Sequence, residues 1–263
     1  MKGLLIMLLG AAIGDIVGSR FEFGNYKATD FELFTEQSDF TDDTVCTVAV
    51  AEWAANGCRG DLAQIMRQWC CRYPVVPGGY GVRFAEWVQR DDAPAYNSWG
   101  NGSAMRVSAV GWVFDSLSDT LNAACDSAVI THNHPEGIKG AQAVAAAVYW
   151  ARNGESKRFI RENISDLFGY DLSRNCEQIR PHYRFDHSCQ GTVPQAFAAF
   201  FDGESFEDTL RLSISLGGDS DTLAAIACSI AEAYYRALPK NMVNAALSRL
   251  PDEMVRVLAR IPA

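Results

Sequence analysis

Helical periodicity recurs along almost the whole chain, and it is the feature that most restricts the fold. Apolar residues, many of them alanine, return at spacings of three and four residues, whereas alternating strand-like runs are scarce. The candidate helices cover residues 3–18, 42–56, 60–72, 103–116, 119–130, 136–152, 156–167, 191–201, 205–216, 220–237, 241–249 and 252–260. With no long Pro/Gly linker and no internal repeat, residues 1–263 are predicted to form one compact all-α domain.

Three segments between these helices are long and irregular. Residues 19–41 are polar and aromatic, residues 74–102 carry many glycines, and residues 169–190 are rich in His, Arg and Tyr. Long loops in a compact domain usually carry function. The last segment has two open interpretations, recognition of a partner protein and a solvated surface loop.

Two acidic clusters each stand directly before an apolar helix. They are TDDT at residues 41–44 and GGDSDT at residues 217–222. Either cluster alone is explained by helix capping, since Asp and Thr satisfy free N–H groups at a helix start. If the two helix starts meet in space, however, four carboxylates converge, and they need protons or cations to neutralise them. Carboxylate and hydroxyl oxygens suit Mg²⁺, Mn²⁺ or Ca²⁺ rather than zinc.

The overall charge and hydropathy narrow the function classes. The formal net charge is −9, which argues against direct nucleic-acid binding through the overall field. Residues 1–18 resemble a signal peptide, with a lysine, an apolar run and small residues. Against an exported protein, Asp15 closely follows the apolar run, and Gly10, Gly14 and Gly18 share one helix face, a spacing that suits close helix packing. No apolar run reaches the ~20 residues that a membrane span needs, so no membrane association is expected.

The eight cysteines indicate a reducing compartment. None forms a CxxC pair, and several, such as Cys46 and Cys228, lie in apolar helical stretches. Buried free thiols explain this pattern better than disulfides or a zinc site. We therefore expect a cytoplasmic protein, and its acidic, well-patterned chain is compatible with a monomer.

Seven motifs, in order along nearly the whole chain, resemble those of the ADP-ribosylglycohydrolases. They are GAAIGDIVGSRFE at 10–22, FTDDT at 40–44, PGGYG at 77–81, GNGSAMR at 100–106, THNHPEGIKGAQAVA at 131–145, GTVPQAF at 191–197 and SLGGDSDTLAAIA at 215–227. The group contains the dinitrogenase reductase-activating glycohydrolase and hydrolases of ADP-ribosyl-arginine and ADP-ribosyl-serine. Each motif alone is weak, and their ordered combination is specific.

This resemblance implies an all-α orthogonal bundle with two divalent cations, Mg²⁺ or Mn²⁺, in a cleft. The implied metal ligands are Thr41, Asp42, Asp43, Asp219, Asp221 and Thr222, and none of these positions departs from the family pattern. The resemblance also implies a catalytic role for Glu22, with Asp43 assisting. A positioned carboxylate suits the cleavage of a glycosidic bond, in which a proton must move. Without the resemblance, a solvated loop acid is the preferred interpretation of Glu22.

The remaining motifs imply the substrate-binding residues. Gly79, Tyr80 and Gly81 would approach the diphosphate, Ser98, Trp99, Gly100, Asn101 and Gly102 the adenosine half, and His132 the phosphate region. Arg106 faces either a phosphate or a local structural partner. A simple turn remains the alternative for the glycine loop, and a core position for Trp99.

The implied activity is release of ADP-ribose from a modified protein side chain, with arginine as the first candidate. Serine-linked ADP-ribose and small ADP-ribose conjugates keep the fold and change the bond. A non-catalytic ADP-ribose-binding protein and a metal phosphohydrolase are the alternatives from other classes. The sequence does not distinguish Mg²⁺ from Mn²⁺, the linkage, or the modified partner.

Overall fold

The computed structural model describes residues 8–261, which form fifteen α-helices and one 3-10 turn without a β-strand in that range. The longer helices are α1 (Leu9–Gly18), α2 (Asp42–Ala55), α3 (Leu62–Arg72), α4 (Val82–Val88), α7 (Leu117–Val129), α8 (Pro135–Arg152), α9 (Lys157–Phe168), α11 (Cys189–Asp202), α12 (Phe206–Ser215), α13 (Ser220–Tyr235), α14 (Lys240–Leu247) and α15 (Asp252–Leu258). Single turns are formed by η1 (Ser19–Phe21), α5 (Gly102–Met105), α6 (Val110–Val113) and α10 (Cys176–Ile179). The predicted all-α class is confirmed.

Side-chain caps explain why many of these helices begin where they do. Ser116, Ser156, Ser188 and Ser205 each accept a hydrogen bond from a backbone N–H in the first turn of the helix that follows. An N-cap of this kind stabilises a helix by about 1 kcal/mol. The predicted helix starts therefore agree with the structure to within a few residues.

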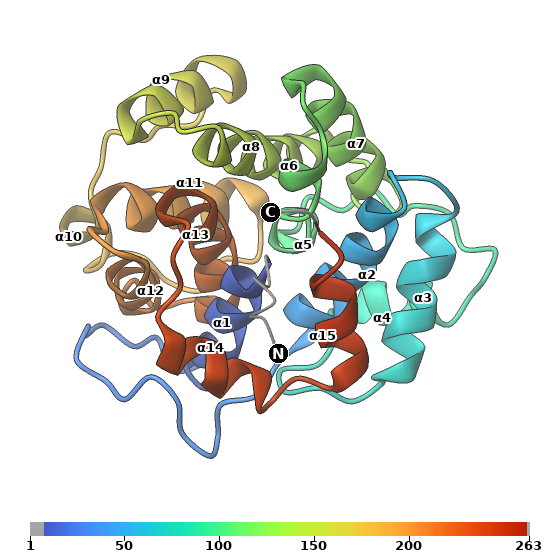
Figure 1. The fold of residues 1–263 in the computed structure, drawn as a ribbon, viewed down its shortest axis with the longest axis horizontal. Helices are drawn as coiled ribbons and strands as arrows, with labels where there is room; N and C mark the ends of the chain where they lie inside the picture. The colour runs from blue at the N-terminus through green and yellow to red at the C-terminus, as the bar shows by residue number, and fades with distance from the viewer. Residues whose placement is uncertain (1–7, 262–263) are drawn as a thin grey trace.

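Helices α1 and α13 lie near the centre of the molecule, with the other helices around them (Figure 1). Their close contact depends on the glycine face of α1. A Cβ atom on Gly10 would collide with the carbonyl oxygen of Cys228, and one on Gly18 with the Cα of Asp221. The expected close packing of this face is confirmed. It also brings the start of α13, with its aspartates, next to the end of α1.

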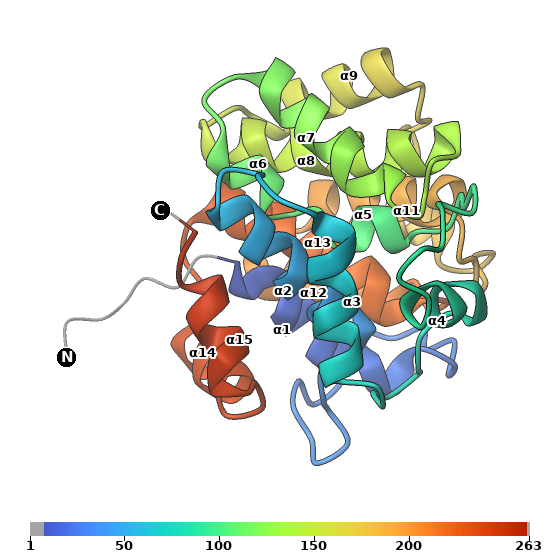
Figure 2. The ribbon, with the colours of Figure 1, turned by 90° about the vertical axis from the view of Figure 1, so that its right-hand side faces the viewer.

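The remaining helices form groups around this central pair. Helices α7, α8 and α9 lie along one edge, and α2, α3 and α4 along another (Figure 1). Seen from the side, α4 lies at the opposite end from α14 and α15 (Figure 2). One cluster of buried apolar side chains connects these groups, and no helix of residues 8–261 is long and apolar enough to cross a membrane.

Three sequence predictions about local structure need correction. The predicted helix 103–116 is broken into α5 and α6, because residues 106–109 turn the chain so that Gly111 packs against Val148 of α8. The glycine-rich segment 74–102 contains α4, and segment 169–190 contains α10. Tertiary packing decides the break between α5 and α6. Helix α10 instead begins with a capping box of Asn175 and Gln178, a local signal that the prediction missed. The first part of the predicted helix 3–18, residues 3–7, lies outside the described residues.

Candidate active site

A cavity of about 560 Å³ opens between the starts of α2 and α13 and the loops that precede α4 and α5. It is lined by Glu22, Asp42, Asp43, Cys46, Gly78, Gly79, Tyr80, Gly81, Val82, Arg83, Phe84, Tyr96, Ser98, Trp99, Gly100, Asn101, Gly102, Met105, Arg106, His132, Phe185, His187, Asp219, Asp221 and Thr222. Every residue predicted for catalysis, metal binding or substrate binding is on this list except Thr41. Segments from the whole length of the chain thus meet at one site.

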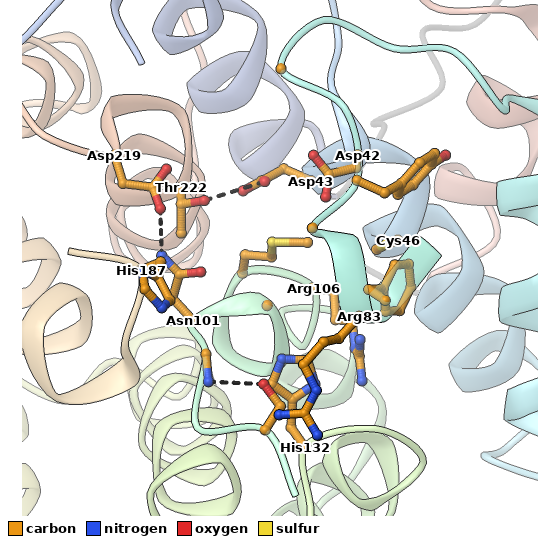
Figure 3. Close-up of a pocket in the computed structure, with 18 of the residues that line it drawn as sticks. Asp42, Asp43, Cys46, Arg83, Asn101, Arg106, His132, His187, Asp219 and Thr222 are labelled. Atoms are coloured by element: carbon orange, nitrogen blue, oxygen red, sulfur yellow. Dashed lines mark hydrogen bonds between the residues drawn. The ribbon is translucent and has the colours of Figure 1, made fainter. Parts of the chain in front are cut away.

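The two acidic helix starts meet, as the metal hypothesis requires. Thr222 Oγ1 donates a hydrogen bond to Asp43 Oδ2 across 3.3 Å, from α13 to α2 (Figure 3). Glu22 joins them, because its carboxylate and those of Asp219 and Asp221 have oxygens within 4.8 Å of one another. The cluster therefore contains five carboxylates, those of Glu22, Asp42, Asp43, Asp219 and Asp221.

Burial and mutual repulsion make this cluster unfavourable as a set of bare anions. Burial, followed by the charges of Asp219 and Asp15, raises the pKa of Glu22 to about 7. Burial and neighbouring acids likewise raise the pKa values of Asp42, Asp43 and Asp221. No lysine or arginine forms an ion pair with these acids within residues 8–261. Cations would relieve this repulsion.

Asp15 is a member of the site that the sequence analysis missed. It is fully buried, accepts hydrogen bonds from the backbone N–H and hydroxyl of Thr41 (2.9 and 2.7 Å), and also accepts from Thr44. Burial raises its pKa to about 6, partly offset by these hydrogen bonds. Asp15 thereby holds the start of α2 in place. An aspartate inside an otherwise apolar helix was the available signal, because a buried charge needs a partner.

Thr41 acts as the N-cap of α2 in this arrangement. Its hydroxyl accepts from the Asp43 N–H (3.2 Å) and donates to Asp15, which leaves it committed to protein partners. The capping interpretation therefore accounts for its hydroxyl, and the ligand role implied by the resemblance stays a prediction.

The glycine loop at residues 77–81 contacts Glu22 directly. Gly78 has a φ of +73°, and a Cβ atom there would collide with Glu22 Oε2. Only glycine combines this left-handed backbone with so close an approach. The N–H of Gly79 donates to Val76 O (3.2 Å), so this amide serves the turn, and the Tyr80 hydroxyl donates to Tyr73 O (2.7 Å). Gly81 also lines the cavity, at the start of α4.

The loop before α5 connects both ends of the cavity. The Asn101 amide donates to Asp219 Oδ2 (2.7 Å) and Thr192 Oγ1 (3.1 Å), so its side chain belongs to the acidic end. Ser98 Oγ accepts from the N–H of Gly100 (3.1 Å), which shapes the loop. The ring of Trp99 is 45% exposed at the cavity wall, so the alternative that placed it in the core is wrong.

His132 and Arg106 lie at the end of the cavity away from the acids (Figure 3). Nε2 of His132 faces Gly100 and Gly102, whose lack of side chains makes room for the ring. Burial and the charge of Arg106 lower the pKa of His132 well below its ordinary value, so the imidazole is neutral near pH 7. Arg106 is fully buried and donates to Ser127 O and Thr131 Oγ1, both at 3.0 Å. These contacts favour its structural role over a phosphate contact.

The unassigned segment 169–190 also reaches the cavity, through Phe185 and His187. Gly218, with a φ of +71°, permits this approach because a Cβ atom there would collide with the ring of Tyr183. The sequence carried no signal for this contact beyond the two glycines before Asp219.

Residues 8–261 thus form an all-helical protein with a cavity lined by clustered carboxylates. A family model, ADP-ribosylglycohydrolase, matches residues 4–261, and the chain belongs to that family. It is 27% identical to ADP-ribosylhydrolase ARH3 of Homo sapiens, over 87% of this chain and 84% of the relative. It is 25% identical to ADP-ribosylarginine hydrolase Tri1 of Pseudomonas putida, over 96% of this chain and 73% of the relative.

A solved structure has the same fold. It is described as an ADP-ribosylglycohydrolase-related protein complex, with a TM-score of 0.75 and 26% identity, and the match covers 98% of this chain and 96% of that one. The resemblance inferred from the motifs is therefore confirmed for the family and for the fold.

Proposed function

We propose that this protein hydrolyses the glycosidic bond between ADP-ribose and a modified protein side chain, with arginine as the first candidate, and releases ADP-ribose. One observation carries the proposal: a single cavity is lined on one side by five clustered carboxylates and the glycine loop that contacts Glu22, and on the other by the exposed Trp99 in the loop before α5. An elongated ligand with a sugar at one end and a base at the other matches this division.

The donor set fits two divalent cations, Mg²⁺ or Mn²⁺. Asp43 Oδ1 is buried and finds no hydrogen-bond partner among the described residues 8–261, and the oxygens of Glu22, Asp219 and Asp221 converge. Hard cations prefer oxygen ligands of this kind. Asp42, Asp43, Asp219, Asp221 and Thr222 would hold the ions. When bound, such ions orient ribose hydroxyls and lower the pKa of a water molecule.

Proton exchange, positioning of the aspartates and substrate binding are assigned to different residues of the chain. Glu22, held against Gly78, is placed to exchange a proton with the attacking water or the leaving group, with Asp43 assisting. Asp15 and Asn101 fix the aspartates at the starts of α2 and α13. Trp99 would stack its exposed ring on the adenine, and His132, as a neutral imidazole, faces Gly100 and Gly102 of the same loop.

The arginine linkage is supported by the relative named an ADP-ribosylarginine hydrolase, at 25% identity. A serine-linked or small ADP-ribose conjugate uses the same cavity and remains the second candidate. The intact acids together with Glu22 argue against a non-catalytic ADP-ribose-binding protein, because a carboxylate placed to exchange a proton serves a chemical step.

A panel of arginine-, serine- and cysteine-linked ADP-ribosyl peptides tests the proposal, with and without chelator, and with products identified by mass. We expect free ADP-ribose and an unmodified peptide. Phosphate as the product would establish a phosphohydrolase instead, and ADP-ribose binding without turnover of any conjugate would establish a binding protein.

A further inference from the structure

Exposed apolar side chains gather at the mouth of the cavity. Among residues 8–261, the large hydrophobic side chains with high exposure are Phe23, Val75, Val82, Trp99, Phe159, Leu167 and Phe185. Val82, Trp99 and Phe185 line the cavity, and Phe23 directly follows Glu22. Because exposed apolar groups are unfavourable in water, their concentration at one opening indicates a surface that a ligand covers.

Phe23 and Phe185 form a pair at this mouth. Their ring centroids are 6.0 Å apart and the rings are inclined by 22°, in a stacked arrangement. Phe23 is 74% exposed and Phe185 is 48% exposed. The two rings therefore support each other while most of the pair's surface stays open to solvent.

The two rings come from separate segments that the fold ties together. Lys27 Nζ donates to Tyr183 O (2.8 Å) and to Leu216 O, which joins segment 19–41 to segment 169–190. The N–H of Gly24 donates to Phe21 O (2.9 Å), a turn that fixes Phe23 beside Glu22. The pair is thus held by hydrogen bonds on both sides and is not a chance contact of two mobile loops.

Its position relates the pair to one part of the substrate. The proposed function puts hydrolysis where the oxygens of Glu22, Asp219 and Asp221 converge. The ADP-ribose moiety would then extend along the cavity toward Trp99, and the departing side chain would extend out of the cavity. Phe185 lines the cavity and stacks on Phe23, the residue that follows Glu22, which places the pair close to the reacting end.

We propose that Phe23 and Phe185 form the subsite for the departing side chain and that its occupant is the planar, cationic guanidinium of ADP-ribosylated arginine. This inference rests on the proposed function and names its substrate class. A guanidinium stacks on aromatic faces, which attract cations, and it is less strongly hydrated than an ammonium. The carboxylates that line the cavity also form no ion pair with a lysine or arginine within residues 8–261, which favours a cation beside them. The oxygen that links serine to ADP-ribose carries no positive charge and belongs to no planar group that could stack on an aromatic ring.

Binding measurements in a slowly reacting protein separate this subsite from the rest of the cavity. In a Glu22→Gln background, we compare the Kd values of an arginine-linked ADP-ribosyl peptide, a serine-linked peptide of the same sequence and free ADP-ribose. Phe23→Ala and Phe185→Ala should each weaken the arginine-linked peptide by about tenfold, as expected for loss of a cation–aromatic contact. The other two ligands should keep their affinities.

Matched variants separate aromatic character from apolar area. Phe159→Ala removes another exposed phenylalanine ring, on α9 and away from the cavity, and should change none of the three affinities. Phe185→Tyr should retain the affinity for the arginine-linked peptide, and Phe185→Leu should lose it. Full retention in Phe185→Leu would overturn the guanidinium assignment, because apolar contact alone would then suffice.

Two further outcomes contradict the inference. Equal weakening of all three ligands would assign the pair to the ADP-ribose moiety itself, and unchanged affinity for the arginine-linked peptide would remove any role in binding. These results are distinct from failure of the proposed function, which is the absence of ADP-ribose release from every conjugate by the unmodified protein.

Discussion

The side-chain amide of Asn101 donates a hydrogen bond to Asp219 Oδ2 across 2.7 Å, although the two residues are 118 positions apart in the chain. The same amide donates to Thr192 Oγ1, so its orientation is fixed. This contact joins the loop predicted to hold adenosine to the acidic end of the cavity. Asn101 is therefore a positioning residue for Asp219.

Replacing Asn101 should weaken metal binding. In Asn101→Ala, Asp219 loses its donor, and we expect the affinity for Mg²⁺ or Mn²⁺ to fall by about 10- to 100-fold, the usual effect of removing such a supporting contact. Titration calorimetry measures this directly. The control is Asn153→Ala, an exposed asparagine whose amide donates to Tyr149 O. Unchanged metal affinity in Asn101→Ala would show that Asp219 needs no positioning.

Removal of metal should abolish turnover. It should also reverse the effect of Asp221→Asn on the melting temperature. Chelation should stop ADP-ribose release, and Mg²⁺ or Mn²⁺ should restore it and raise the melting temperature. Asp221→Asn relieves repulsion in the metal-free protein, because burial and neighbouring acids raise the pKa of Asp221. We expect this variant to melt higher than the unmodified protein in chelator and lower in saturating metal. Full activity in chelator would contradict the two-ion site.

Glu22→Gln tests the chemical step. The amide cannot exchange the proton, so turnover should fall by about a hundredfold or more. The close approach to Gly78 is compatible with the isosteric amide, so the fold and the affinity for ADP-ribose should survive. Single-turnover kinetics and calorimetry separate the two effects. Turnover equal to that of the unmodified protein would make Glu22 an ordinary loop acid.

Trp99→Ala tests the adenine end. A ring stacked on a base contributes about 1–3 kcal/mol, so the affinity for ADP-ribose should fall by roughly tenfold or more. The ring is 45% exposed, so the melting temperature should change little. Trp99→Phe should recover much of the loss, and metal affinity is the internal control. If affinity is unchanged in Trp99→Ala, the adenine lies elsewhere.

A pH dependence of stability is expected from Glu232, which is fully buried and lies outside the cavity. Its carboxylate accepts from the N–H groups of Leu9 (3.1 Å) and Gly10 (2.9 Å) at the start of α1. Burial raises its pKa from 4.5 to about 7, partly offset by these hydrogen bonds. The folded state therefore binds the proton more tightly, and stability falls as pH rises from about 4.5 to 7 and then levels off. This group contributes about 3 kcal/mol of that fall.

Denaturant unfolding of Glu232→Gln measures this contribution. The variant cannot ionise, so its free energy of unfolding should decline less than that of the unmodified protein between pH 5 and 7.5. The other acids are common to both proteins, so the difference isolates Glu232. An exposed substitution, Glu177→Gln, should leave the profile unchanged. Parallel profiles for Glu232→Gln and the unmodified protein would show that Glu232 keeps its ordinary pKa.

Part of this molecule follows from local sequence patterns. The helical class, most helix starts and the glycine face of α1 are encoded by neighbours within a few residues, through periodicity and capping. The acidic clusters were recognisable for the same reason, since each stands at the start of its own helix. The break between α5 and α6 was not, because it depends on how Gly111 meets α8.

The sequence by itself determined the helical class of the fold, the carboxylates available for the site, and the family that the ordered motifs resemble. Only the tertiary structure decided how they combine. It placed Glu22 against Gly78 and paired Asn101 with Asp219. It also set Asp15 beneath the start of α2 and brought Phe185 to Phe23. The physical reason is that these contacts join residues far apart in the chain, and their geometry comes from packing of the whole core, which no local pattern records.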